Sequence, residues 1–116
     1  MDLYHIWCDL KPGTGDLQFA DKVAAYMSHL KHQGLIEDWR LTRRKLGLGP
    51  PGLGEFHIVI ETKDMAQLDR AFHHVASRRE PAESVHHGVN SLVHNAIFGL
   101  YRDFPDADRH HGEEMF

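Results

Sequence analysis

Two histidines on predicted β-strands are the side chains best suited to chemistry near neutral pH. His5 lies in the stretch LYHIWCDL (residues 3–10), and His57 lies in EFHIVIE (residues 55–61). An imidazole changes its charge near neutral pH, so it can transfer a proton or ligate a metal. Trp7 shares a side with His5, because successive side chains of a strand alternate between its two faces. This side therefore offers acid–base groups next to an aromatic surface.

Two further residues fit the same chemistry. Arg44 could hold an anionic or enolate oxygen beside a histidine that moves a proton, and Tyr101 could stack with Trp7 on an aromatic ring. This combination suits a cofactor-independent monooxygenase or an isomerase that acts on a small ring compound. We expect a small-molecule pocket and no cofactor, with a ligand-binding set of His5, Trp7, Arg44, His57 and Tyr101.

A metal site is an alternative use of the same face. Two histidines and a carboxylate can hold a transition metal, and the residues available are His5, His57, Asp9 and Glu61. The adjacent histidines of the helical segments are poorer ligands, because neighbouring side chains on a helix point about 100° apart. The chain has no HExxH pattern, and its single cysteine excludes a zinc site built from several cysteines.

The totals of the sequence narrow the class of protein. A chain of 116 residues fits one domain, and 41% hydrophobic with 26% charged residues is typical of a soluble globular protein. A net charge of −4 argues against a nucleic-acid partner. The sequence has neither a run of about 20 apolar residues nor a basic-then-apolar signal region, so we expect no membrane partner and a cytoplasmic location.

Hydrophobic periodicity predicts the elements that must position these side chains. Apolar residues recur every three or four positions in residues 16–33, which indicates a helix, whereas residues 55–61 alternate as a strand does. The other expectations are strands at 3–10, 36–46 and 94–103, a loop at 47–54, helices at 64–78 and 82–92, and a polar, mobile tail at 105–116. We expect a single domain over residues 1–116.

The order β-α-β-β-α-(α)-β predicts a ferredoxin-like α+β sandwich, with helices on one face of a four-stranded sheet and the strand order 4-1-3-2. We expect the first and third strands to be neighbours and to run parallel, which would place His5 beside His57. Pairing of the second and third strands would bring Arg44 near His57 and Arg40 near Glu61.

The two faces of this sheet differ in character. The face toward the helices would be apolar, with Tyr4, Ile6, Cys8, Leu10, Trp39, Leu41, Phe56, Ile58 and Ile60. The opposite face would carry His5, Trp7, Asp9, Arg40, Thr42, Arg44, His57, Val59 and Glu61. A mixed aromatic and charged face favours association with a second copy, so we expect a homodimer. A structural or regulatory dimer without a substrate is the competing function.

The element order, the length and the strand-into-helix stretch EFHIVIETKDMAQLDRAF resemble the dimeric α+β barrel superfamily over residues 3–104. This resemblance implies two ferredoxin-like chains packed sheet to sheet. The superfamily includes antibiotic-biosynthesis monooxygenases, haem-degrading enzymes, muconolactone isomerase-like proteins and stress-responsive proteins, and no family catalytic residue is carried over.

In many such relatives the ligand lies between the sheet and the helices of one chain. Here that space would be bordered by Tyr4, Phe19, Tyr26, His29, Phe72 and His73. We expect these side chains to be core packing, because aromatic residues at helical spacing usually are.

Overall fold

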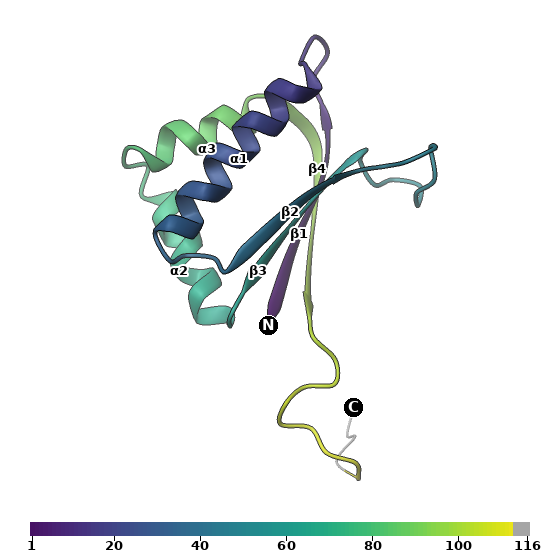
Figure 1. Cartoon of the computed structure of the whole chain (residues 1–116), viewed down its shortest axis with the longest axis vertical. Helices are drawn as coiled ribbons and strands as arrows, with labels where there is room; N and C mark the ends of the chain where they lie inside the picture. The colour runs from purple at the N-terminus through teal and green to yellow at the C-terminus, as the bar shows by residue number, and fades with distance from the viewer. Residues whose placement is uncertain (113–116) are drawn as a thin grey trace.

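Three helices cover one face of a four-stranded sheet and leave the other face open (Figure 1). The computed structural model describes residues 1–112. The elements are β1 (Asp2–Leu10), α1 (Asp16–His32), β2 (Asp38–Arg43), β3 (Phe56–Thr62), α2 (Met65–Ala76), α3 (Ala82–Asn90) and β4 (Val93–Arg102). The predicted ferredoxin-like α+β architecture is confirmed.

The sheet order is β2-β3-β1-β4, which is the predicted order read from the other edge. All three strand pairs are antiparallel, so the prediction that β1 and β3 run parallel was wrong. The reason is topological. The crossover through α1 returns the chain so that β1 and β2 run in the same direction, and the hairpin between β2 and β3 then reverses it.

The core lies between the sheet and α1. β3 alternates between buried and half-buried residues along its whole length, as a strand with one covered face should. α1 contributes its apolar stripe, which consists of Phe19, Val23, Met27 and Leu30. Cys8 is buried among these side chains, and burial together with Asp9 raises the pKa of its thiol to about 11. A thiol that stays protonated suits the packing role expected for it.

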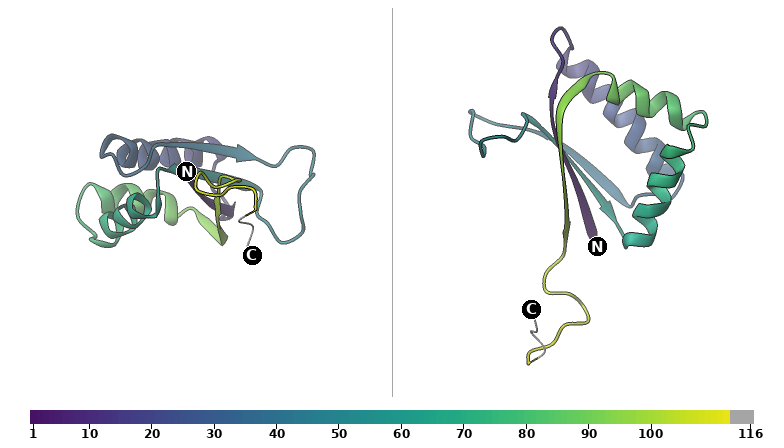
Figure 2. Two further views of the ribbon diagram at one scale, coloured as in Figure 1. Left: turned by 90° about the horizontal axis from the view of Figure 1, so that it is seen from below. Right: turned by 180° about the vertical axis from the view of Figure 1, so that it is seen from behind.

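The connection between β2 and β3 is longer than predicted. β2 ends at Arg43 rather than at residue 46, because Leu46 and Gly47 take positive φ angles of 57° and 67° that an extended strand does not allow. The connection projects from the sheet on the side away from the helices (Figure 2), and it carries the exposed side chains of Leu46 and Leu48.

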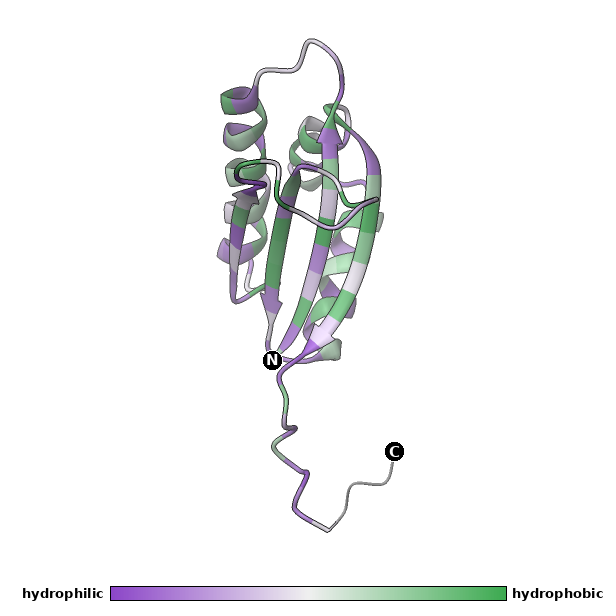
Figure 3. Cartoon of the chain, turned by 90° about the vertical axis from the view of Figure 1, so that its right-hand side faces the viewer, coloured by the Kyte–Doolittle hydropathy of each residue, from purple (hydrophilic) through white to green (hydrophobic). Residues whose placement is uncertain are grey.

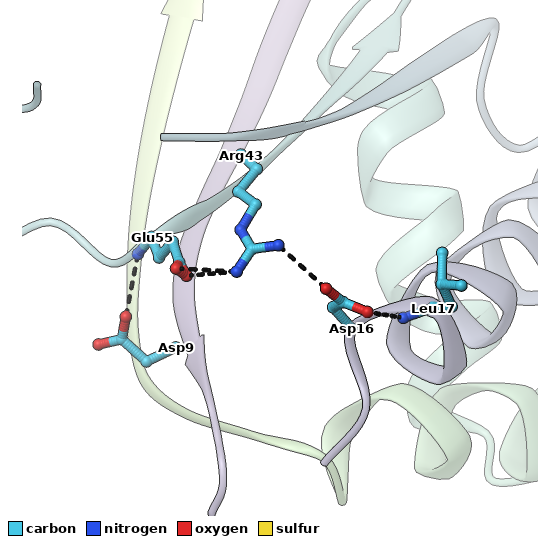
Figure 4. Close-up of polar contacts among 5 residues, drawn as sticks. All are labelled: Asp9, Asp16, Leu17, Arg43 and Glu55. Carbon is cyan, nitrogen blue, oxygen red and sulfur yellow. Dashed lines mark hydrogen bonds and ion pairs between the residues drawn. The ribbon is translucent and has the colours of Figure 1, made fainter. Parts of the chain in front are cut away.

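A chain of polar contacts holds the end of this hairpin against the start of α1 (Figure 4). The Arg43 guanidinium donates to Asp16 at 3.0 Å and to Glu55 at 3.4 Å, and the backbone N–H of Glu55 donates to Asp9 Oδ1 at 2.9 Å. Exposed ion pairs of this kind contribute little to stability, because water screens them. Their main effect is therefore to fix position rather than to add stability.

Residues 103–112 leave the end of β4 without forming a helix or a strand (Figure 1). Residues 113–116, which also belong to the predicted tail, lie outside the described residues. None of the helices within residues 1–112 has the length and apolar character that crossing a bilayer requires.

Candidate functional site

Figure 3 shows the open face of the sheet, which we call the outer face. Four of the five predicted ligand-binding residues meet on this face. The antiparallel register places Trp7 opposite His57. His5 lies two residues before Trp7 on β1 and therefore points to the same face. The Trp7 and His57 rings stack with centroids 4.6 Å apart, and the His5 and His57 rings stack at 5.1 Å. Tyr101 meets His5 edge-on at 4.8 Å. We call these four residues the histidine cluster.

A hydrogen bond of 2.8 Å joins His5 Nδ1 to His57 Nε2. One imidazole must donate its N–H while the other accepts, so the contact is compatible with two neutral rings. Burial lowers the pKa of both rings, and the neighbouring His5 lowers that of His57 further. The second ring nitrogen of His5, Nε2, is buried and has no hydrogen-bond partner within residues 1–112.

Gly99 makes room for the cluster, although nothing in the sequence analysis singled it out. A Cβ atom there would lie 3.2 Å from Trp7 Cζ3 and 3.2 Å from Tyr101 Cε1. The indole therefore lies over the backbone of β4 at the one position without a side chain. The signal in the sequence is a lone glycine inside an alternating strand, which often marks a close approach.

Arg44, the fifth predicted ligand-binding residue, lies in the connection between β2 and β3. Its guanidinium donates to the carbonyl oxygen of Leu53 at 2.5 Å. Its backbone N–H donates to the carbonyl oxygen of Glu55 at 2.7 Å. It shares a hollow of about 280 Å³ with Trp7 and His57. Its main contacts nevertheless hold the β2–β3 connection.

The register corrects the two predicted arginine contacts. Thr42, not Arg44, lies opposite His57 in the pairing of β2 with β3. Arg40 lies opposite Val59 rather than Glu61. The pairing is therefore displaced by two residues from the predicted one, which keeps every side chain on its predicted face.

The four-residue metal alternative does not assemble. The structure brings His5 and His57 together, but Asp9 accepts a hydrogen bond from the backbone of Glu55 instead of facing them. Glu61 is paired in register with Leu3. Within residues 1–112, no three histidine, cysteine, aspartate or glutamate side chains converge on a point that could hold a metal ion.

The histidine cluster predicts a loss of stability in acid. The pKa values of His5 and His57 are lowered in the folded chain, so at acid pH the unfolded chain binds more protons. Their contribution to the free energy of unfolding is complete above the unfolded value near ~6.5, and it is lost as the pH falls from there through the lowered pKa values of the folded chain. We expect a lower thermal midpoint at pH 5 than at pH 7.5, at fixed salt.

A double variant, His5→Gln with His57→Gln, isolates this effect. Its midpoint should fall less between the two pH values than that of the wild type. Part of the fall should remain, because the pKa of His29 is lowered as well. Identical falls in the two proteins would contradict the assignment.

A second space, which we call the inner cavity, lies between the sheet and the helices and has a volume of about 410 Å³. Its walls are Tyr4, Ile6, Cys8, Val23, Tyr26, Met27, Ile58, Phe72, Val75, Ala76, His86, Val89, Asn90, Val93, Ala96 and Phe98. The expectation of core packing holds for Phe19, which packs against Phe56, and for Tyr4 and Tyr26, which pack against the buried core and also border the cavity. Phe72 lines the cavity but is 48% exposed, so it is not part of the core. His29 and His73 lie outside these walls.

Four polar side chains line the inner cavity: Tyr4, Tyr26, His86 and Asn90. The Tyr26 and His86 rings meet at 5.5 Å, and no hydrogen bond joins these four side chains to another residue within 1–112. Burial, with a smaller effect of Tyr4, raises the pKa of Tyr26 to about 12. Both tyrosines therefore remain protonated hydrogen-bond donors near neutral pH.

His86 and Asn90 were not among the site residues predicted from the sequence. Their signal is the four-residue spacing on a predicted helix, which places them on one side of α3 together with Val89. The spacing alone does not predict a cavity, because His86 is half-buried and Asn90 is exposed.

Solved structures of low sequence identity share this fold. SnoaB from Streptomyces nogalater, a cofactor-independent oxygenase, is 10% identical, with a TM-score of 0.69 over 93% of this chain and 97% of that one. A protein from Arabidopsis thaliana is 8% identical, with a TM-score of 0.70 over 89% and 95%. A dimeric ferredoxin-like protein of unknown function from Jannaschia sp. is 11% identical, with a TM-score of 0.63 over 89% and 100%.

No curated protein matches the chain. The structural likenesses establish the fold, which alone does not give a function. The model of a family of unknown function, DUF6614, matches residues 1–116, and the chain therefore belongs to that family.

Proposed function

We propose that this protein binds a compact, uncharged and largely apolar small molecule in the inner cavity. The observation that carries this proposal is the cavity itself, an open space of about 410 Å³ with mostly apolar walls and four polar side chains that have no hydrogen-bond partner within residues 1–112. Ligand sites commonly have volumes of roughly 300–1,000 Å³ and combine apolar walls with a few polar groups.

The lining indicates the class of ligand. Its walls contain no lysine, arginine, aspartate or glutamate, so a charged ligand would be buried without a counter-charge. Tyr4 packs edge-on against Phe72 at 5.3 Å and stacks with Phe98 at 6.0 Å, which forms an aromatic wall. The protonated tyrosine hydroxyls would donate to an oxygen acceptor. A ring compound with a carbonyl group meets both requirements.

The outer face supports a second part of the proposal, which is that two copies pair through it. Ile97 and Tyr101 are 40% and 59% exposed there, next to the half-buried Trp7. Soluble proteins seldom leave such adjoining apolar side chains in water. Pairing would enclose the histidine cluster, as the dimer predicted from the sequence requires. The Jannaschia protein of the same fold is dimeric, which agrees with this arrangement.

Catalysis is the second candidate function, as a cofactor-independent monooxygenase or an isomerase acting on a ring compound. The favouring observation is the imidazole of His86 inside the inner cavity, in contact with Tyr26. This imidazole could accept a proton from a bound ring compound while a tyrosine hydroxyl donates to the oxygen that gains charge. The name of SnoaB as a cofactor-independent oxygenase agrees with this candidate.

Binding of 2-acetylnaphthalene, an uncharged ring ketone, tests the inner cavity. We expect saturable binding by titration calorimetry, and a Tyr26→Phe variant should bind about three- to tenfold more weakly because it loses one hydrogen bond. Naphthalene has no carbonyl oxygen, so Tyr26→Phe should not change its affinity.

The matched control is Tyr101→Phe, which removes the same hydroxyl from the outer face and should leave both affinities unchanged. Absence of saturable binding to the wild type would contradict the proposal. A stronger effect of Tyr101→Phe than of Tyr26→Phe would instead place the ligand in the histidine cluster, where the sequence analysis expected it.

A further inference from the structure

A second pair of histidines joins α1 to α2 on the helical side of the sheet. His29 Nε2 and His74 Nε2 lie 2.9 Å apart, and the two rings are stacked with centroids 5.2 Å apart and an angle of 28° between their planes. Both side chains are half-buried, and neither lines the inner cavity. The pair thus has no part in the function proposed above.

The geometry of this pair is close to that of a metal-ligand pair. Both rings direct the same nitrogen, Nε2, to one point, where a single proton bridges them in the free protein. Two imidazole ligands at about 2.0–2.1 Å from a tetrahedral zinc ion have their nitrogens about 3.3 Å apart. To replace the proton by a cation, the two nitrogens must move apart by about 0.4 Å and both rings must turn until their lone pairs meet at the ion.

We propose that His29 and His74 form a binding site for a divalent cation of the zinc, nickel and copper class, which bridges α1 and α2. Imidazole nitrogen suits these metals. No third ligand already converges on the pair within residues 1–112, so water molecules take up other coordination positions. His32 lies one helical turn beyond His29 and is exposed, so its ring is available as a further ligand after rotation.

The surroundings favour this pair over the two other histidine arrangements. The His5–His57 pair is flanked by the rings of Trp7 and Tyr101 and lies on the surface proposed to pair two copies. His73, next to His74 in sequence, instead places Nδ1 2.9 Å from the carbonyl oxygen of Asp69. Burial, and then His74 and His32, lower the pKa of His29, which favours the neutral form that binds metals.

Zinc titration of the chain without any affinity tag tests the site. The protein is first dialysed against a chelator and then titrated with zinc chloride at pH 7.5 by calorimetry. We expect one tight site per chain and a higher thermal midpoint with zinc, because a ligand that binds only the folded state stabilises it. In His29→Gln and in His74→Gln, binding should weaken by at least about tenfold and the zinc-dependent rise should disappear.

The matched control is His73→Gln, which removes an exposed histidine adjacent to the site and should keep wild-type binding. Circular dichroism without zinc shows whether each variant is folded, and either single variant suffices if the other is not. Equal zinc affinity in the wild type and the His29→Gln or His74→Gln protein would overturn the proposal. A wild type without a tight site, or an equal loss in His73→Gln, would do the same.

Discussion

An Ile97→Lys variant is expected to be monomeric at concentrations at which we expect the wild-type chain to be a dimer. Ile97 lies on β4 opposite Trp7 and faces away from the helices, within the surface proposed to pair two copies. It is 40% exposed in the single chain, so a lysine there can reach water and should leave the fold intact. In the dimer the same lysine would be enclosed without a counter-charge.

The expected effect is large because of symmetry. Enclosing an unpaired charge costs about 3–5 kcal/mol, and a two-fold interface contains the substitution twice. Even half of one such penalty would weaken the dimer by about tenfold or more. Sedimentation at several micromolar concentrations, at pH 7.5 and fixed salt, measures the difference.

Leu100→Lys is the matched control. Leu100 lies three residues further along β4, opposite Tyr4 on the helical side, and is 51% exposed. Its lysine variant carries the same charge on the same strand but on the other face, and it should remain dimeric. A wild-type chain that is monomeric, or equal dissociation of both variants, would remove the proposed pairing.

The alternation of side chains explains why the two faces of the sheet could be predicted. The two-residue period of a strand places His5, Trp7 and His57 on one face whatever the direction of the neighbouring strand. Their meeting therefore survived the wrong prediction that β1 and β3 run parallel. The error in the predicted register of β2 did not affect it either, because a displacement by two residues keeps each side chain on the same face of the sheet.

The contacts of Arg44 depended on information that alternation does not contain. The connection of residues 44–55 is long enough to allow several registers between β2 and β3, and its positive φ angles at Leu46 and Gly47 ended β2 early. The nearest acceptors of the Arg44 guanidinium are backbone carbonyls of this connection. A local turn geometry thus decided the role of this arginine.

The inner cavity could not be predicted because it depends on the distance between layers. The apolar stripe of a helix shows which side faces the sheet, but it does not show whether the facing side chains fill the space between them. Tyr26 and Phe19 lie on the same helix toward the same sheet; Phe19 is fully packed, whereas Tyr26 borders the cavity. The contact between His29 and His74 likewise depends on how α1 and α2 are placed.

A Gly54→Ala variant is expected to lose much of its stability. Gly54 lies just before β3, and a Cβ atom there would overlap the backbone carbon and oxygen of Cys8 on β1. Backbone atoms cannot rotate away as a side chain can. The overlap also falls beside the contact between Asp9 and the Glu55 N–H, which closes this end of the β1–β3 pair.

We therefore expect a loss of about 3 kcal/mol, toward the upper range for overpacking, and a fall in the thermal midpoint of roughly 10 °C. Gly88→Ala in α3 is the control, because its Cβ would meet only Lys22 Cδ, at 3.5 Å. That variant should be as stable as the wild type or more stable by up to about 1 kcal/mol, since alanine favours a helix over glycine. Equal midpoints for Gly54→Ala and the wild type would show that β1 and β3 do not approach so closely at this end, and the position of the Asp9–Glu55 contact would then be wrong as well.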